Sequence, residues 1–397
     1  MDILAGSPRV LRTLNEKAVL ERLLSAGPLT RTELEAFTGL SKPAMFEMLR
    51  RLEAAGLIYR DGEKAGTSGP KAGLWSIEPT ASFVVGIDVT RHGVNAALAD
   101  LTGGIVATAY QASEPDERYD ARERLFKVIT ELAEKARIQP EAIDQFVVGL
   151  PGIVDFENGN LRKGQQLRNW EGFHIADAIG EWSGHPHVLI ENDVNLVALE
   201  EMSSGMAKGI QSFVLFWMGD GVGAGVVIDG KLLRGTTGAA GELGGIVIAE
   251  RTYGSQAGAT NLAPLENLLS CSAIEALARG HGLVGTNSVD TIRKAAASLE
   301  HSAFFADLAQ RVTAGLAGAI GILDPQMVVL GGVVGRAAGM PLVQRVTENL
   351  RPLIVSLPVV VTSTVKESGA RDGAVALALR HARERLFAGG SAARGQP

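Results

Sequence analysis

A glycine-rich turn between two apolar runs is the feature of this 397-residue sequence that most restricts its fold. Residues 212–218 and 224–228 have the composition of buried strands, and the segment GDGVG at 219–223 joins them. Glycines at such a turn let backbone N–H groups approach a ligand, often a phosphate, although most such turns only reverse the chain. Glu242 follows in a second glycine-rich segment, where few side chains crowd its carboxylate. The pattern predicts a strand–turn–strand unit and leaves open whether a nucleotide, a sugar or neither binds there.

The first eighty residues predict three helices in quick succession. Asn15 can cap the first helix, and Thr30 with Glu33 three residues later forms the capping-box pattern of the second. Gly39 suits the left-handed position after that helix, and Ser41 can then cap the third. A short turn of this kind between two helices is typical of a helix-turn-helix unit.

The apolar spacing of these helices separates a core from an exposed face. The residues expected in the core include Leu34, Phe37, Met45, Leu49 and Leu52. A recognition helix presents its N-terminal residues to base edges in the major groove. The candidate DNA contacts of the third helix are therefore Ser41, Lys42, Pro43, Ala44, Phe46 and Arg50.

A wing follows the helices. Residues 57–60 and 73–77 have strand character, and the loop between them carries Lys64 and Lys71, which are candidates for contacts with phosphates or the minor groove. Residues 1–80 carry 11 basic and 10 acidic residues, a net charge of only +1, so DNA binding would depend on local placement of cations. A three-helix interaction module that does not bind DNA stays open as the alternative.

Cysteine count and termini restrict the compartment. The only cysteine, Cys271, excludes an internal disulfide and any zinc site built from several cysteines. The first residues lack the pattern of a signal peptide, and no run of about 18 apolar residues predicts a membrane span. We therefore expect a cytoplasmic protein with no membrane partner.

After Glu78-Pro79 the pattern changes to two successive α/β series. The predicted strands are 83–89, 93–100, 104–110, 145–150, 187–190, 212–218, 224–228, 231–234, 327–330 and 353–361. The predicted helices are 117–137, one that follows Asp193, 272–282, 289–321 and 371–386. Two series of this kind favour two α/β lobes with a cleft between them.

Five motifs within these series carry a resemblance. They are GLPGIVD at 149–155, ENDVN at 191–195, GDGVGAGVVIDGKL at 219–232, GAAGELG at 238–244 and LDPQMVVLGG at 323–332. In this order, behind a winged helix, they resemble the ROK family of repressors, open reading frames and sugar kinases, and within it the regulators that respond to xylose or N-acetylglucosamine. The resemblance implies an α/β protein in which a winged helix-turn-helix domain precedes a two-lobed actin-like (ribonuclease-H-like) sugar-kinase fold.

The same resemblance suggests a division of the chain. Residues 1–80 would be the winged helix-turn-helix DNA-binding domain. Residues 81–195, with the C-terminal helix 371–386, would form the first lobe, and residues 196–370 the second, sugar-sensing lobe.

Site residues follow from the resemblance as well. It implies a sugar-binding set of Asn192, Asp193, Glu242 and Glu266. Asp193 stands where family kinases carry the base that takes a proton from a sugar hydroxyl, and Asn192 can hydrogen-bond hydroxyls. The two glutamates match carboxylates that accept hydrogen bonds from the sugar.

Two departures from the family argue against a kinase. Family kinases carry Asp-x-Gly-Gly-Thr after the first strand, whereas this chain has Asp88 followed by Val, Thr90, Arg91 and His92. Backbone that must approach a phosphate closely does not readily accept such side chains. The alternative is that Arg91 itself binds a phosphate.

The zinc site of the family is the second departure. Gly245 replaces the family histidine, and residues 253–266 contain no cysteine. We therefore expect no metal and no cofactor.

The sequence thus predicts a sugar-responsive regulator, with repression favoured by resemblance, that binds operator DNA as a homodimer or homotetramer. We expect no enzymatic activity. The alternatives are an active ATP-dependent sugar kinase with an accessory DNA-binding domain, and a regulator that senses a protein partner.

Overall fold

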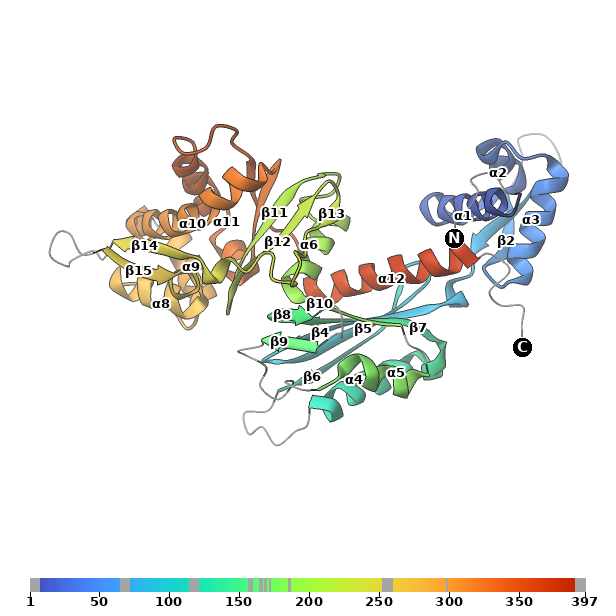
Figure 1. The fold of residues 1–397 in the computed structure, drawn as a ribbon, viewed down its shortest axis with the longest axis horizontal. Helices are drawn as coiled ribbons and strands as arrows, with labels where there is room; N and C mark the ends of the chain where they lie inside the picture. Colours follow the sequence, from blue (N-terminus) through green and yellow to red (C-terminus); the bar gives the residue numbers. More distant parts are fainter. Residues whose placement is uncertain are drawn as a thin grey trace.

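The computed structural model has a winged-helix part and two α/β lobes arranged along an extended molecule (Figure 1). It describes residues 8–64, 72–113, 121–155, 160–163, 167, 170, 173–184, 187–251, 260–297 and 299–389. Among these residues, no helix is long and apolar enough to cross a membrane.

The winged-helix part contains the predicted three helices and a small antiparallel sheet. Its helices are α1 (Pro8–Ala26), α2 (Arg31–Thr38) and α3 (Lys42–Ala54), and its strands, in sheet order, are β1 (Leu29–Thr30), β3 (Ala72–Ile77) and β2 (Ile58–Lys64). The capping box is confirmed: Glu33 donates its amide to the Thr30 hydroxyl, and the Thr30 amide donates to the Glu33 carboxylate at 2.8 Å. Gly39 is left-handed, with φ 71°.

Three local predictions for this part are wrong or altered. The first helix begins at Pro8, so Asn15 lies inside it and does not cap it. Ser41 occupies the N-cap position of α3, but its side chain makes no capping hydrogen bond. Phe37 is 49% exposed rather than in the core, and the guanidinium of Arg22 lies 5.4 Å from its ring centre.

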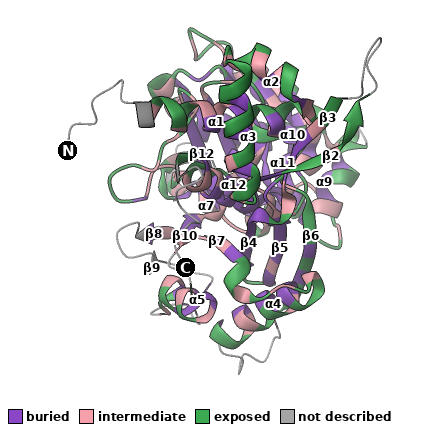
Figure 2. Cartoon of the chain, turned by 90° about the vertical axis from the view of Figure 1, so that its right-hand side faces the viewer, coloured by how far each residue is buried: buried purple, intermediate pink, exposed green. Residues whose placement is uncertain are grey.

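The first lobe is built on a five-stranded sheet. In sheet order its strands are β10 (Val188–Asn192), β7 (Ile143–Leu150), β4 (Phe83–Thr90), β5 (Gly93–Asp100) and β6 (Ile105–Ala112). Both central strands, β4 and β5, are buried along most of their length (Figure 2). Helices α4 (Ala121–Ala136) and α5 (Ile175–Ser183) cover one face, where Val85 and Ile87 belong to the core (Figure 1). A short hairpin, β8 (Ile153–Asp155) with β9 (Asn160–Lys163), follows β7.

The second lobe repeats this plan. In sheet order its strands are β13 (Lys231–Leu232), β12 (Val222–Ile228), β11 (Phe213–Met218), β16 (Met327–Gly331) and β17 (Val359–Thr362). Its helices are α7 (Glu266–Leu269), α8 (Cys271–Gly280), α9 (Ser288–Ala296), α10 (Ser302–Leu323) and α11 (Gly332–Leu350). They form the largest apolar core of the molecule on one face of the sheet. A hairpin, β14 (Val247–Arg251) with β15 (Thr260–Pro264), projects from this lobe.

Two helices join the lobes through one shared core. Helix α6 (Asp193–Ser203) and helix α12 (Gly369–Gly389) pack together between the second faces of the two sheets. Their approach is close because a Cβ added at Gly373 would lie only 2.0 Å from the carbonyl oxygen of Leu196. Val84 of the first lobe and Leu215 of the second both belong to this core.

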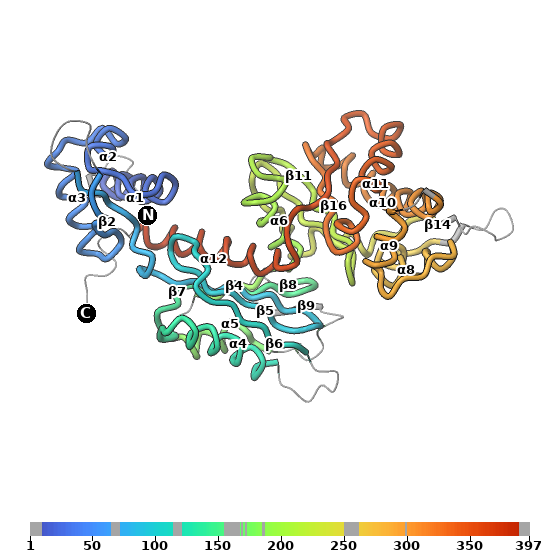
Figure 3. Tube along the Cα trace, turned by 180° about the vertical axis from the view of Figure 1, so that it is seen from behind, coloured from blue at the N-terminus to red at the C-terminus, as the bar shows by residue number. Residues whose placement is uncertain are grey.

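The far end of α12 enters the winged-helix part (Figure 3). Phe387 is 1% exposed and shares a core with Val19, Leu20 and Trp75. Leu101, from the turn after β5, belongs to the same core. The core of the winged-helix part therefore includes residues that belong to the lobes.

Several predicted boundaries in the second lobe are wrong. The expected strand 353–361 is only β17, because residues 351–357 form turns. The expected helix 289–321 is interrupted after α9 by a single 3₁₀ turn, Leu299–His301. Residues 247–251 and 260–264, where the sequence predicts no strand, form β14 and β15. Lys71 of the wing lies outside the described residues.

Truncating Phe387 should destabilise the winged-helix part although this residue is more than 300 positions away in sequence. Removing a buried phenyl ring costs about 3–5 kcal/mol. We expect Phe387→Ala to lower the unfolding temperature and to increase hydrogen exchange in α1 and α3. Phe46→Ala is the matched control, because that ring is 56% exposed and should change stability by less than about 0.5 kcal/mol. Equal stability of the two variants would contradict a shared core.

Candidate functional site

The junction of β10 and α6 holds two of the predicted sugar-binding residues. Asn192 caps α6, because its side-chain oxygen accepts a hydrogen bond of 3.0 Å from the amide of Asn195. Its side-chain nitrogen donates to the carbonyl of Gly152 at 3.1 Å. The next residue, Asp193, begins the helix, and among the described residues its carboxylate accepts local hydrogen bonds from backbone amides, that of Val194 and its own. Asn192 is thereby fixed in orientation and Asp193 keeps acceptor capacity.

Two glycines bring Glu242 toward this junction. Gly241 has φ 93°, and a Cβ there would lie 2.0 Å from the carbonyl oxygen of Ala224 on β12. Gly244 is equally close to the strand, since its Cβ would lie 2.6 Å from the oxygen of Val222 and 2.9 Å from Oε2 of Glu266. The segment that carries Glu242 therefore lies directly on β12, with Glu266 beside it. Only glycine permits this approach.

A third carboxylate, Asp88 at the end of β4, completes the set. It is 8% exposed, and its Oδ1 has no hydrogen-bond partner among the described residues. Burial, together with the nearby charge of Asp193, raises the pKa of Asp88 to about 7, and Arg371 opposes the shift. Burial likewise raises the pKa of Asp193 to about 6; the charge of Glu242 adds to the rise, and hydrogen bonds from backbone amides oppose it. We refer to Asp88, Asp193 and Glu242 as the carboxylate cluster.

Sequence reasoning did not select Asp88 as a site residue. The signal was present, because Asp88 opens the segment that replaces the kinase motif. Arg371 carried no local signal, since it comes from α12 and reaches the cluster only through the tertiary fold.

Two ion pairs connect the lobes around the cluster. Glu191 at the end of β10 is buried and pairs with Arg234, after β13, with 2.7 Å between Oε2 and Nε. Arg91 and His92, in the turn after β4, both contact Asp220 in the glycine-rich turn of the second lobe, at 2.7 and 3.1 Å. The two turns that the sequence marks as possible phosphate loops are therefore bridged by side chains of the chain itself.

The predicted DNA-contacting face lies on α3. All of its described members are exposed: Ser41, Lys42, Pro43, Ala44, Phe46 and Arg50. Met45, Leu49 and Leu52 are buried beneath them, as predicted.

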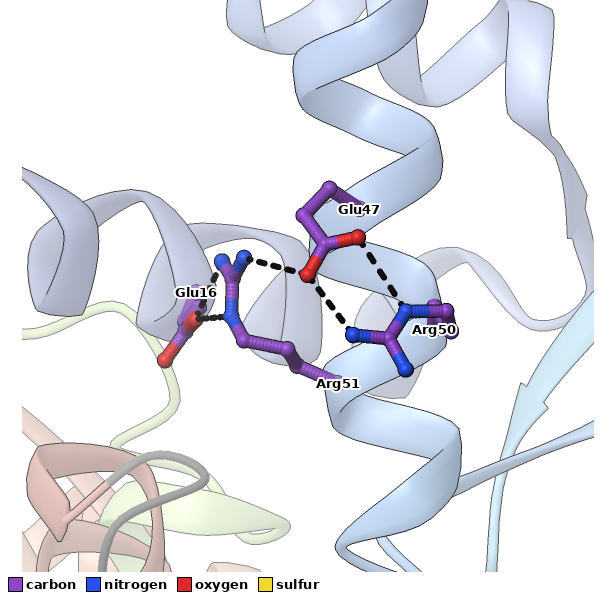
Figure 4. Close-up of polar contacts among 4 residues, drawn as sticks. All are labelled: Glu16, Glu47, Arg50 and Arg51. Carbon is purple, nitrogen blue, oxygen red and sulfur yellow. Dashed lines mark hydrogen bonds and ion pairs between the residues drawn. The ribbon is translucent and has the colours of Figure 1, made fainter.

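Both arginines of α3 are engaged by carboxylates (Figure 4). Arg50 donates to Glu47 through Nε at 3.1 Å and through Nη2 at 2.9 Å, which holds the pKa of Glu47 below its usual range. Arg51 pairs with the buried Glu16 of α1 at 2.8 Å and lies 3.7 Å from Glu47. Glu47 therefore offsets positive charge on the face that would meet DNA.

Metal ligands do not gather anywhere in the described parts of the chain, where no group of three or more His, Cys, Asp or Glu side chains could hold an ion. The zinc site of the related family does not fit these residues. The single cysteine, Cys271, begins α8, and its amide donates to the carbonyl of Gly219 at 2.8 Å. Burial is the main cause that raises the pKa of its thiol.

Comparison with known families assigns both parts of the chain. The ROK family model matches residues 84–381, and the MarR family model matches residues 12–66. A xylose repressor from Caldicellulosiruptor bescii is 26% identical over 342 residues, which cover 82% of this chain and 84% of that protein.

Two solved structures resemble the fold. A ROK family transcriptional regulator, described as a homologue of the Escherichia coli MLC protein, superposes with a TM-score of 0.74 and 22% identity, covering 96% of this chain and 98% of that one. The ROK hexokinase of Thermus thermophilus superposes with a TM-score of 0.62 and 25% identity, covering 76% of this chain and 99% of the hexokinase. The expected winged helix followed by a sugar-kinase fold is thus confirmed.

The raised pKa of Asp88 makes stability depend on pH. In the folded protein the Asp88 carboxyl stays protonated up to about pH 7. In the unfolded chain, where its pKa has the ordinary value of 3.8, it loses the proton at a much lower pH. Folding therefore takes up a proton in this window, and stability falls as pH rises through it. We expect Asp88→Asn to raise the unfolding temperature near pH 8 by about 2–4 °C, which corresponds to about 1 kcal/mol for a domain of this size, and to have less effect near pH 5. A pH-independent effect in thermal unfolding scans would contradict the assignment.

Proposed function

This chain belongs to the ROK family, and from that premise we propose that it is a transcription regulator whose affinity for operator DNA changes when a small sugar or sugar derivative binds at the carboxylate cluster. The main support for this proposal is that helix α12 reaches both the carboxylate cluster and the winged-helix part. Arg371, near the start of α12, attracts the charge of Asp88, and Phe387, near its end, lies in the winged-helix core. The two residues are about 24 Å apart along the helix, at 1.5 Å per residue.

The chemistry of the cluster suits a sugar. Carboxylate oxygens accept hydrogen bonds from hydroxyl groups, and Asn192 keeps a second amide hydrogen for the same purpose. Glu266 is adjacent to Gly244 and adds a further acceptor. In this proposal Asn192, Asp193, Glu242 and Glu266 hold the ligand, and Asp88 and Arg371 join them.

Repression is the direction we propose, because the xylose repressor cited above matches most of the chain. Helix-turn-helix proteins usually bind half-sites related by two-fold symmetry, so we propose a homodimer or homotetramer that acts on DNA in the cytoplasm. Ligand and DNA would be coupled through lobe positions, because a ligand shifts such an equilibrium only by its different affinity for two states.

An active sugar kinase is the second candidate, and the likeness to a ROK hexokinase favours it. Two observations support a regulator without kinase activity. Thr90 and Arg91 stand where family kinases have glycines. In addition, Arg91 and His92 contact Asp220, so the phosphate of a nucleotide would have to compete with that carboxylate.

One experiment separates these functions. The protein is screened by thermal shift against neutral sugars, and ligands that stabilise it are tested for release of DNA bound from a selected library. At a hundredfold excess over Kd a ligand should stabilise the protein by about 2.7 kcal/mol. Phosphorylation of a sugar with ATP and Mg²⁺ that is abolished by Asp193→Asn would establish the kinase instead. Stability unaffected by every sugar would favour a protein partner as the signal.

Removing the positive charge of Arg50 should weaken DNA binding. Arg50→Ala should lower the affinity for a duplex and, if Arg50 contacts a phosphate, reduce the salt slope by about one unit. Glu47→Gln should do the opposite, because it frees Arg50 and removes a charge that repels DNA. Affinities for a non-specific duplex at several salt concentrations measure both changes. Unchanged binding in both variants would remove this pair from the interface.

Glu242 should be needed for the ligand response and not for DNA binding. Glu242→Gln keeps the size of the side chain and removes its charge, so we expect operator affinity within about twofold of the original and a loss of at least about tenfold in sugar affinity, which corresponds to one lost charged hydrogen bond. Titration calorimetry and operator release measure the two properties separately. A variant released at the original sugar concentration would exclude Glu242 from the site.

A further inference from the structure

The charges around the carboxylate cluster restrict which sugars it can accept. Three acidic side chains converge there, and one of them, Asp88, is buried with an oxygen that lacks a partner among the described residues. Such an oxygen is costly to bury unless a ligand donates a hydrogen bond to it. A hydroxyl group can donate to it, whereas a phosphate brings further negative charge and acceptor oxygens.

Three arginines near the cluster, among the residues that the structure describes, have acidic partners. Arg371 donates to Asp372 at 2.7 and 2.9 Å. Arg234 donates to Glu191 at 2.7 Å. The guanidinium groups of these described arginines are therefore engaged by carboxylates rather than open to a phosphate in two-point geometry.

The third arginine is the informative one. Arg91 would be the natural cation for a phosphate that reached the turn after β4, with His92 beside it. Asp220 meets both of them from the glycine-rich turn, at 2.7 Å and 3.1 Å, and so stands where an anion would have to bind. A phosphate at this point must displace the Asp220 carboxylate and then lie close to it.

We propose that the carboxylate cluster selects uncharged, unphosphorylated sugars, and that Asp220 enforces this choice by neutralising Arg91, with His92 also in contact with the Asp220 carboxylate. The proposal rests on the proposed function, because it names the chemical class of ligand for the same site. Asp193 and Asp88 would accept sugar hydroxyls, and Asp220 would exclude a phosphate from the neighbouring turns. The selection therefore depends on residues from both lobes.

The test compares each of three neutral sugars, glucose, xylose and N-acetylglucosamine, with its phosphate monoester. In the original protein, at least one neutral sugar should bind and release DNA, and its phosphate should bind at least about tenfold more weakly, a difference of about 1.4 kcal/mol. In Asp220→Asn the affinity for the phosphate should rise by about tenfold, while the neutral sugar keeps its affinity within about twofold. Adding Arg91→Ala to Asp220→Asn should remove this gain.

Asp229→Asn is the matched control, because Asp229 is exposed in the next turn of the same sheet and the substitution makes the same change in charge. It should leave the preference unchanged. A sugar phosphate that binds the original protein as tightly as its parent sugar, or an equal gain in both Asn variants, would overturn the proposal. If only a sugar phosphate releases the DNA, the proposed regulator function holds, but the proposed selection for neutral sugars is wrong. If no sugar or phosphate binds, the proposed function itself fails.

Discussion

Helix α12 contacts the first sheet, helix α6 and the winged-helix core along its length, and these contacts fix where the other parts can lie. The contact with α6 depends on Gly373, whose missing side chain lets α12 approach the backbone of Leu196. The contact with β4 depends in the same way on Gly86, where a Cβ would lie 2.5 Å from the amide nitrogen of Val375. Side-chain atoms at either glycine would push the helix away from the lobes. The distance at which α12 presents Phe387 to the winged helix is therefore set by two close backbone contacts.

The arrangement of charge supports the proposal that this chain senses a sugar without phosphorylating it. Asp88 and Asp193 have raised pKa values because they are buried near each other and near Glu242. Such carboxyls can exchange hydrogen bonds with hydroxyl groups near neutral pH. The turns that could hold phosphates are joined instead by Arg91 and Asp220. The chain thus retains the carboxylates that would bind a sugar, while its own side chains pair across the adjoining turns.

Sequence reasoning succeeded where the determinants are local. Thr30 and Glu33 are three residues apart, and their capping box follows directly from that spacing. The strand before Asp193 and the helix after it were likewise predicted from neighbouring residues. The exposed face of α3 followed from helical periodicity.

The same reasoning failed where contacts between residues far apart in the chain determine the structure. The apolar run before residue 361 suggested a long strand, but β17 pairs only over four residues of β16, and Pro358 cannot donate a hydrogen bond. The pairing of Arg91 with Asp220 and the burial of Phe387 join residues far apart in the chain, and no local pattern predicts such contacts. The first helix also begins earlier than its capping pattern predicts, because Asn15 lies inside a helix that begins at Pro8.

The burial of Phe387 has a consequence for how the protein folds during its synthesis on the ribosome. Chains emerge N-terminus first, and N-terminal domains generally fold while the rest is still being made. Here the winged helix emerges first, but its core stays incomplete until α12 has been synthesised. The part that would bind DNA is the first to be made and among the last to be finished. A chain that ends before Phe387 would lack that core residue, so only molecules that extend past it would have the finished winged-helix core.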